Sequence, residues 1–166
     1  MAAPPEVSTV TLAAWRDRSG FCGVQPPAAP SGFLRPAQIR HLSGIAGQVA
    51  VSHDLLSEFA DRYAAFPGQL VAARTRELSA VRALLERYGT DPHFRYAIPD
   101  DLRERGLLSR TDALDVIVQL ATGMIGAIEE ALIGLEAMDV RMVYVGMLSA
   151  AHRQRRLAQA WGAGTR

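Results

Sequence analysis

The feature that most constrains the fold is the spacing of apolar residues, which recur at three- and four-residue steps from Pro36 to Trp161. This period places apolar side chains on one face of an α-helix, and no competing strand pattern is present. Pro67-Gly68, a connection over 90–108 and a short break near 137–139 divide the pattern into four segments. With two tight turns and one longer crossover, the sequence predicts an all-α fold, an antiparallel four-helix bundle.

Several residues mark where the predicted helices begin and end. Pro36 suits the first turn of a helix, and Gly89 follows Tyr88 at the position where a C-terminal glycine belongs. Ser109 and Asp112 resemble a capping box at the start of the third helix, and Gly162 is expected to end the fourth. Within the long connection we predict one short turn over 102–105.

Residues 1–35 differ from the rest because they are rich in proline and hold only one short apolar run. Such composition favours an extended chain over packed structure. We therefore divide the sequence into an extended N-terminal arm, 1–35, and a helical domain, 36–166. The arm either lies along the surface or docks to a protein partner, with Trp15, Phe21 and Phe33 as anchors.

Composition excludes several functions. The chain has 166 residues, enough for one domain, and a net charge of +1, which gives no field for nucleic-acid binding. All 18 basic residues are arginine, so a Schiff-base or P-loop lysine is impossible, and Cys22 is the single cysteine. Charged or amide residues interrupt every apolar run, and the start lacks a signal peptide. We expect no membrane segment and a cytoplasmic protein.

Polar residues interrupt the apolar stripes near the middle of each predicted helix. Arg74 lies between Leu70 and Leu78, with Glu77 three residues on as a partner if the guanidinium is buried. The alternative is that Arg74 extends its charged end to solvent. The other members of this set, which could meet inside the bundle, are Gln48, Ser52, Thr122 and Gln154.

Glycines also lie inside the predicted helices, although each costs about 1 kcal/mol relative to alanine there. They are Gly44, Gly47, Gly123, Gly126 and Gly146. Either helix backbones approach closely at these positions or the missing side chains leave a cavity. We expect close packing, because protein interiors rarely contain voids.

Three stretches carry a resemblance to a known family: residues 80–89 (AVRALLERYG), Asp112-Ala113-Leu114 leading to the stretch 129–132 (EEAL), and Val143-Tyr144. With them, residues 40–161 resemble a small bacterial and archaeal family of ferritin-like proteins. The resemblance implies a four-helix bundle. Because these motifs are mostly structural, they support the fold more than any activity.

The resemblance also implies a di-metal site, and this sequence departs from it at every ligand position. In the second helix, the stretch from Arg74 to Glu77 stands in place of Glu-x-x-His, and in the third helix Ala121 and Thr122 stand in place of the carboxylates. Gln154 replaces the histidine of the fourth helix, and Gln48 replaces the glutamate of the first. Arginine, alanine, threonine and glutamine are not primary iron ligands. We expect that the protein uses no metal and no cofactor.

The leading functional hypothesis is a binding or interaction protein that holds a small anionic ligand where the metals once lay. Its predicted ligand-binding residues are Gln48, Arg74, Glu77, Thr122 and Gln154, with Arg74 contacting the anion. The alternatives are a cofactor-independent enzyme with Glu77 as general base and a di-iron oxidase with relocated ligands. By analogy with other bundles, we also expect that the protein pairs as a homodimer.

Overall fold

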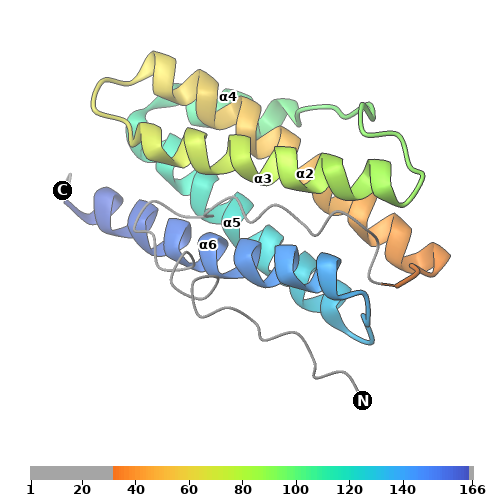
Figure 1. Cartoon of the computed structure of the whole chain (residues 1–166). Helices are drawn as coiled ribbons and strands as arrows, with labels where there is room; N and C mark the ends of the chain where they lie inside the picture. Colours follow the sequence, from red (N-terminus) through yellow and green to blue (C-terminus); the bar gives the residue numbers. More distant parts are fainter. Residues whose placement is uncertain (1–31, 165–166) are drawn as a thin grey trace.

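The computed structural model describes residues 32–164, and this part of the chain is all-helical, without strands. The helices are α2 (Pro36–Arg62), α3 (Gly68–Arg87), α4 (Asp100–Leu108), α5 (Arg110–Leu132) and α6 (Met138–Ala163) (Figure 1). The predicted all-α class is thus confirmed. The short turn predicted at 102–105 is a nine-residue helix, α4, which begins with two aspartates in its first turn, where the helix dipole favours them.

Two of the predicted helix ends are confirmed in atomic detail. After α3, Gly89 adopts φ +73°, and the amides of Gly89 and Thr90 donate to the carbonyls of Glu86 (3.1 Å) and Leu85 (2.8 Å). This pair of hydrogen bonds is the Schellman motif, which a glycine best accommodates. At the start of α5, the Oγ of Ser109 accepts a hydrogen bond from the Asp112 amide at 3.0 Å, as the capping pattern predicts.

Other boundaries differ from the prediction. The chain leaves α2 at Arg62 and turns through Ala65, at φ 59°, which brings Phe66 edge-on to the ring of Phe59. The break between α5 and α6 covers residues 133–137, where Gly134 has φ +65°, rather than 137–139. Helix α6 continues through Gly162 to Ala163 instead of ending at the glycine.

The four long helices form a closed ring of contacts. Helix α2 packs along α3, α3 contacts α6, α6 packs along α5, and α5 contacts α2. Figure 1 shows α2 and α3 side by side, with α6 on the other side of the molecule. The short helix α4 contacts α5 and α2, so it covers the line along which these two helices meet.

The apolar core divides into two clusters that share no residue. The first is built from Leu42 to Ala50 on α2, Leu78 to Leu85 on α3, Met124 to Ala131 on α5 and Val140 to Ala151 on α6. The second is built from Leu55 to Phe59 on α2, Leu70 on α3, Ala113 to Ile117 on α5 and Ala158 on α6, with Phe66 and Leu102 added. Every long helix therefore contributes to both clusters.

Helix α5 differs from the expectation that charged or amide residues leave no apolar run long enough to cross a membrane. Over residues 110–132 it is long and apolar enough to cross a membrane by length and composition. A core helix passes the same test, and α5 contacts α2, α4 and α6. Length and composition alone are therefore weak evidence that α5 spans a membrane.

The N-terminal arm falls almost entirely outside the described residues. Of its three predicted aromatic anchors, Trp15 and Phe21 lie outside them, as does Cys22, while Phe33 is 78% exposed. Leu34, next to it, is buried against the first cluster. The chain thus joins the core one residue before the predicted end of the arm at residue 35.

Candidate functional site

A layer of buried polar side chains lies between the two apolar clusters. It consists of Ser52 on α2, Arg74 and Glu77 on α3, and Gln154 on α6, each at most 2% exposed. On every one of these helices, the polar residue falls between the stretch that builds the first cluster and the stretch that builds the second. Helix α5 contributes Ala121 at this level, buried but in neither cluster. We call Ser52, Arg74, Glu77 and Gln154 the polar layer.

The arginine of the polar layer is paired, as one of the two sequence interpretations predicts. The Nη1 of Arg74 donates to the Oε2 of Glu77 at 2.5 Å, and the two side chains are 1% and 0% exposed. Burial raises the pKa of Glu77 above its ordinary value, although the positive charge and hydrogen bond of Arg74 oppose the shift. The alternative, in which Arg74 reaches solvent, is wrong.

Five buried atoms of the polar layer make no hydrogen bond within the described part of the chain. They are the Oγ of Ser52, the Nε of Arg74, the Oε1 of Glu77, and the Nε2 and Oε1 of Gln154. A buried polar atom without a partner costs about 1–3 kcal/mol. Buried groups of this kind ordinarily hydrogen-bond to protein or to ordered water.

Two of the predicted ligand residues do not belong to this layer. Gln48 is exposed, and Ser52, one turn further along α2, holds the inward position instead. Thr122 is exposed, and its Oγ1 donates to the carbonyl of Val118 at 2.8 Å. Successive residues of a helix point about 100° apart, so Ala121 faces the core and Thr122 does not. The prediction that Gln48 and Thr122 line the interior is wrong.

A second feature is an open groove of about 500 Å³ on the outside of the line where α2 and α5 meet. The connection between α3 and α4 forms its far wall. Its lining residues are all uncharged: Gly44, Gly47, Gln48, Val51, Tyr96, Ala97, Pro99, Leu102, Gln119, Leu120 and Gly123. We call this the α2–α5 groove. It places Gln48 in a different candidate site from Arg74.

Three of the helix glycines line this groove, and close packing does not explain them. A Cβ built on Gly44, Gly47, Gly123 or Gly126 meets no atom within 4 Å outside its own helix backbone, so the expectation of close helix contact is wrong at these four positions. Gly44, Gly47 and Gly123 line the groove, and the missing side chains leave its floor open. Three such glycines together cost about 3 kcal/mol of helix stability, and packing does not account for that cost.

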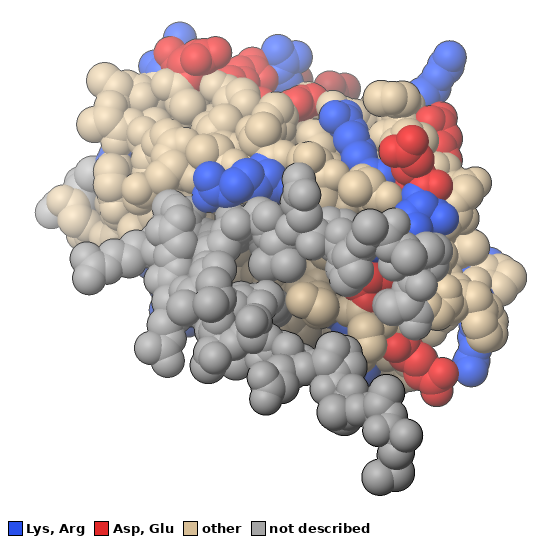
Figure 2. Space-filling view, viewed as in Figure 1, with Lys and Arg blue, Asp and Glu red and all other residues tan. Residues whose placement is uncertain are grey.

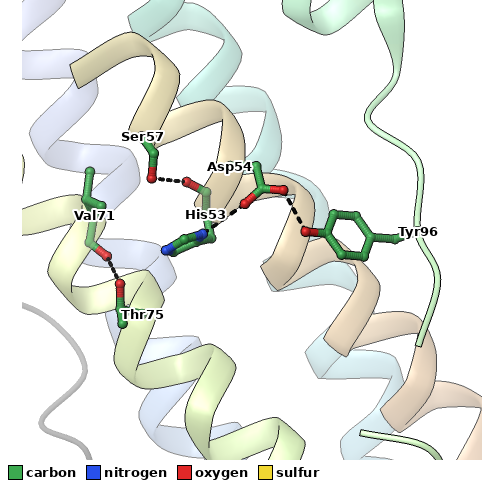
Figure 3. A network of polar contacts seen from close by, with 6 residues as sticks. All are labelled: His53, Asp54, Ser57, Val71, Thr75 and Tyr96. Carbon is green, nitrogen blue, oxygen red and sulfur yellow. Dashed lines mark hydrogen bonds and ion pairs between the residues drawn. The ribbon is translucent and has the colours of Figure 1, made fainter. Parts of the chain in front are cut away.

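Polar contacts join the far wall of the groove to α2 (Figure 3). The hydroxyl of Tyr96 donates to the Oδ2 of Asp54 at 2.6 Å, and the other oxygen of that carboxylate lies 3.0 Å from the Nδ1 of His53. The hydrogen bond to Asp54, followed by partial burial, raises the pKa of Tyr96 above its ordinary value. The contact ties the α3–α4 connection, which lines the groove, to α2.

A buried carboxylate that was not among the predicted site residues, Asp139, lies in the first turn of α6. Its side chain is fully buried and accepts hydrogen bonds from the Nη1 of Arg87 at 2.9 Å and from the hydroxyl of Tyr88 at 2.8 Å. An acidic residue in the first turn is typical of a helix start, so Asp139 belongs to α6 and not to the predicted break over 137–139. Asp139 joins the end of α3 to the start of α6.

No metal site is found in residues 32–164, and the face of the molecule seen in Figure 2 carries charges of both signs. No group of three or more histidine, cysteine or acidic side chains in this part of the chain is arranged to hold a metal ion. On the face in Figure 2, basic and acidic side chains are interspersed. Comparison with protein-family models, with curated proteins and with solved structures gives no match for this chain.

Proposed function

We propose that this chain is a metal-independent binding protein that holds a small uncharged molecule in the α2–α5 groove. The observation that carries the proposal is a groove of about 500 Å³ whose lining contains no charged residue. Sites for small ligands are typically about 300–1,000 Å³ in volume, mostly apolar, with a few polar groups that orient the ligand. The proposal keeps Gln48 as a ligand residue and replaces the anion of the sequence hypothesis by a neutral molecule.

The shape of the groove favours a flat, largely apolar ligand. The helix surface is reduced to backbone at Gly44, Gly47 and Gly123, so a ring can approach α2 and α5 closely. The ring of Tyr96 stands on the opposite wall, where it can pack against an aromatic ligand. The amide of Gln48 supplies a donor and an acceptor for a polar edge, and Gln119 adds the donor of its Nε2, since its Oε1 already accepts from the guanidinium of Arg105.

We further propose that the four long helices form an antiparallel bundle of ferritin-like ancestry. The support is the closed ring of helix contacts and the level at which Arg74, Glu77, Ala121 and Gln154 gather. These are residues that the resemblance places at metal positions, and none but Glu77 is a ligand type. The binding function would then have arisen after the metal chemistry was lost.

The test uses N-phenyl-1-naphthylamine, an uncharged aromatic probe whose fluorescence rises in apolar surroundings. We expect saturable binding to the full-length protein. Gly123→Leu, which places a side chain in the groove, should weaken binding at least tenfold. Gly126→Leu is the matched control, because Gly126 lies on the same helix with equally open space around its Cβ but does not line the groove.

Two results would contradict the proposal. Equal affinity in Gly123→Leu and Gly126→Leu would show that the probe binds elsewhere. A lack of saturation in the folded wild-type protein would show that the groove does not hold an uncharged aromatic molecule. Circular dichroism of both variants establishes that they remain helical.

A further inference from the structure

We propose that the N-terminal arm docks on its own molecule: residues 10–15 lie in the α2–α5 groove, with the indole of Trp15 over the glycine floor. The arm then competes with the small molecule that the groove binds. This competition rests on the proposed function, whereas the docking is measured without an added ligand. Residues 1–31 lie outside the described part of the chain; support comes from the groove, from the place where the described chain begins and from the sequence of the arm.

The first step is that the groove suits an aromatic side chain. It has a volume of about 500 Å³ and no charged lining residue. A Cβ added at Gly44, Gly47 or Gly123 would meet no atom within 4 Å outside its own helix, so a flat ring reaches the helix backbone there. The ring of Tyr96 offers a packing surface, and the side-chain oxygen of Gln48 is an acceptor for the N–H of a buried indole.

The second step is that the described residues leave much of the groove floor uncovered. Only 44% of the apolar 18-residue window of α5 is buried by them. Residues 116–128 of α5 carry no charge, and residues 41–53 of the adjacent helix α2 hold no arginine and no acidic residue. An uncharged surface that extends over two neighbouring helices is typical of a face that another segment covers.

The third step is the position at which the arm joins the helical domain. A Cβ on Gly32, the first described residue, would lie 3.5 Å from the Cα of Ala137, in the connection that follows α5. The Nε2 of Gln38, in the first turn of α2, donates to a backbone carbonyl of the same connection at 3.2 Å. The arm therefore begins where α2 starts and α5 ends. Gly44 and Gly123 lie about 12–14 Å along these helices from that end, at 1.5 Å per residue.

The fourth step is the reach of the arm. Trp15 lies 17 residues before Gly32. A flexible segment of that length has a root-mean-square end-to-end distance of about 20–25 Å, which exceeds the distance to the groove floor. Tethering at such a range gives an effective concentration of about millimolar, so a weak contact is enough to fill the groove.

The fifth step distinguishes Trp15 from the other aromatic residues of the arm. Phe33 precedes Leu34, which is buried in the first apolar cluster and so holds Phe33 at the start of α2. Phe21 lies in a glycine-rich stretch. Trp15 instead ends an uncharged stretch, residues 7–15, which charged residues bound on both sides. Only this stretch matches the uncharged lining while its flanking charges stay in water.

The docking is tested by paramagnetic relaxation in the full-length, nitrogen-15-labelled protein. Cys22→Ser removes the single cysteine, and Ala14→Cys then carries a nitroxide next to the proposed anchor. We expect enhanced relaxation at the amides of Gly44 and Gly123. The amides of Ser79 on α3 and Ser149 on α6, which are exposed and do not line the groove, should show none above background.

Matched variants identify both sides of the contact. Trp15→Ala in the spin-labelled protein should remove the enhancement, whereas Phe21→Ala, in the same arm, should leave it. Gly123→Leu fills the groove and should also remove it, and Gly126→Leu should not. Circular dichroism establishes that each variant remains helical.

The competition is measured with N-phenyl-1-naphthylamine and without the spin label. We expect Trp15→Ala to raise the affinity for this probe at least about threefold, which corresponds to an arm that fills the groove in about two thirds of wild-type molecules. Phe21→Ala should bind the probe as the wild type does.

The inference is overturned if the groove glycines show no enhancement in the folded, spin-labelled protein, or if the enhancement persists in Trp15→Ala. A mixture of nitrogen-15 protein without nitroxide and spin-labelled protein without nitrogen-15 tests for a second copy. Enhancement at the groove in that mixture would place the arm of another molecule there and would equally refute the inference.

Failure of this inference and failure of the proposed function are distinguishable. Probe binding that is unchanged in Trp15→Ala, with no enhancement at the groove, would refute the docking and leave the proposed function standing. Enhancement at the groove in a protein that does not bind the probe would support the docking and refute the proposed function.

Discussion

The ring of Phe59 occupies the space next to Gly106 where any other residue would carry a side chain. A Cβ on Gly106 would lie 2.0 Å from the Cζ of Phe59 and 2.5 Å from its Cε1. The contact joins α4 to α2, and the hydroxyl of Tyr63 reinforces it by donating to the carbonyl of Gly106 at 2.8 Å. Glycine is therefore required at this position for close approach and not for backbone freedom.

Gly106→Ala should consequently destabilise the protein although alanine is the better helix former. Phe59 is fully buried and has to move, and overpacking of this kind costs about 1–3 kcal/mol. Urea denaturation measures the loss. Gly126→Ala is the control, since its Cβ meets open space, and it should raise the free energy of unfolding by up to about 1 kcal/mol. Equal effects in the two variants would contradict the packing described here.

Removing one partner of the Arg74–Glu77 ion pair should lower the free energy of unfolding more than replacing both partners by apolar residues. Arg74→Ala leaves the fully buried Glu77 without its partner, and such a loss typically costs about 3–5 kcal/mol. The double substitution Arg74→Met with Glu77→Leu replaces both charges by apolar groups, and it should be as stable as the wild type or more so. Chemical denaturation of the three proteins checks this order. A double variant less stable than Arg74→Ala would refute it.

Asp139→Ala should separate the end of α3 from the start of α6. The substitution removes the acceptor of Arg87 and Tyr88 and the first-turn carboxylate of α6, which accepts from the Val140 amide at 2.9 Å. We expect a loss of about 3 kcal/mol, at the lower end for a buried pair because Arg87 is partly exposed. Hydrogen exchange should accelerate most at residues 138–141. Uniform acceleration along the chain would contradict a local role.

The hydroxyl of Tyr96 should titrate above pH 10 because its hydrogen bond to Asp54 favours the protonated form. The sign follows from the raised pKa: the contribution to stability is complete below the ordinary pKa and is lost as the pH rises through the folded pKa. In Asp54→Asn, the pKa of Tyr96 should fall back toward its ordinary value. Ultraviolet difference titration of tyrosine, with Tyr96→Phe to assign the signal, measures the change.

The sequence was sufficient to predict the all-helical class and several of its boundaries. Pro36, Gly89 and Ser109 act through local geometry, and the structure has each in the predicted role. The break between α5 and α6 was predicted too late, because the first-turn position of Asp139 depends on Arg87 and Tyr88, which lie about fifty residues away along the chain. Long-range contacts of that kind leave no periodic signal.

For the candidate sites, the sequence predicted the helices that supply polar residues more accurately than it predicted which residues of those helices face inward. Arg74, Glu77 and Gln154 are buried as predicted because they fall on strong apolar stripes. Gln48 and Thr122 lie at the edges of their stripes, where a difference of one residue rotates the side chain by about 100°. The α2–α5 groove was missed because its far wall comes from the α3–α4 connection, whose path the helical pattern does not specify.

The division of the core has a mechanical consequence. Each long helix is held by apolar contacts near both ends, whereas at mid-length α2, α3 and α6 present the side chains of the polar layer to the interior and α5 presents only Ala121. A torque applied to one end of the molecule would therefore be taken up at the polar layer.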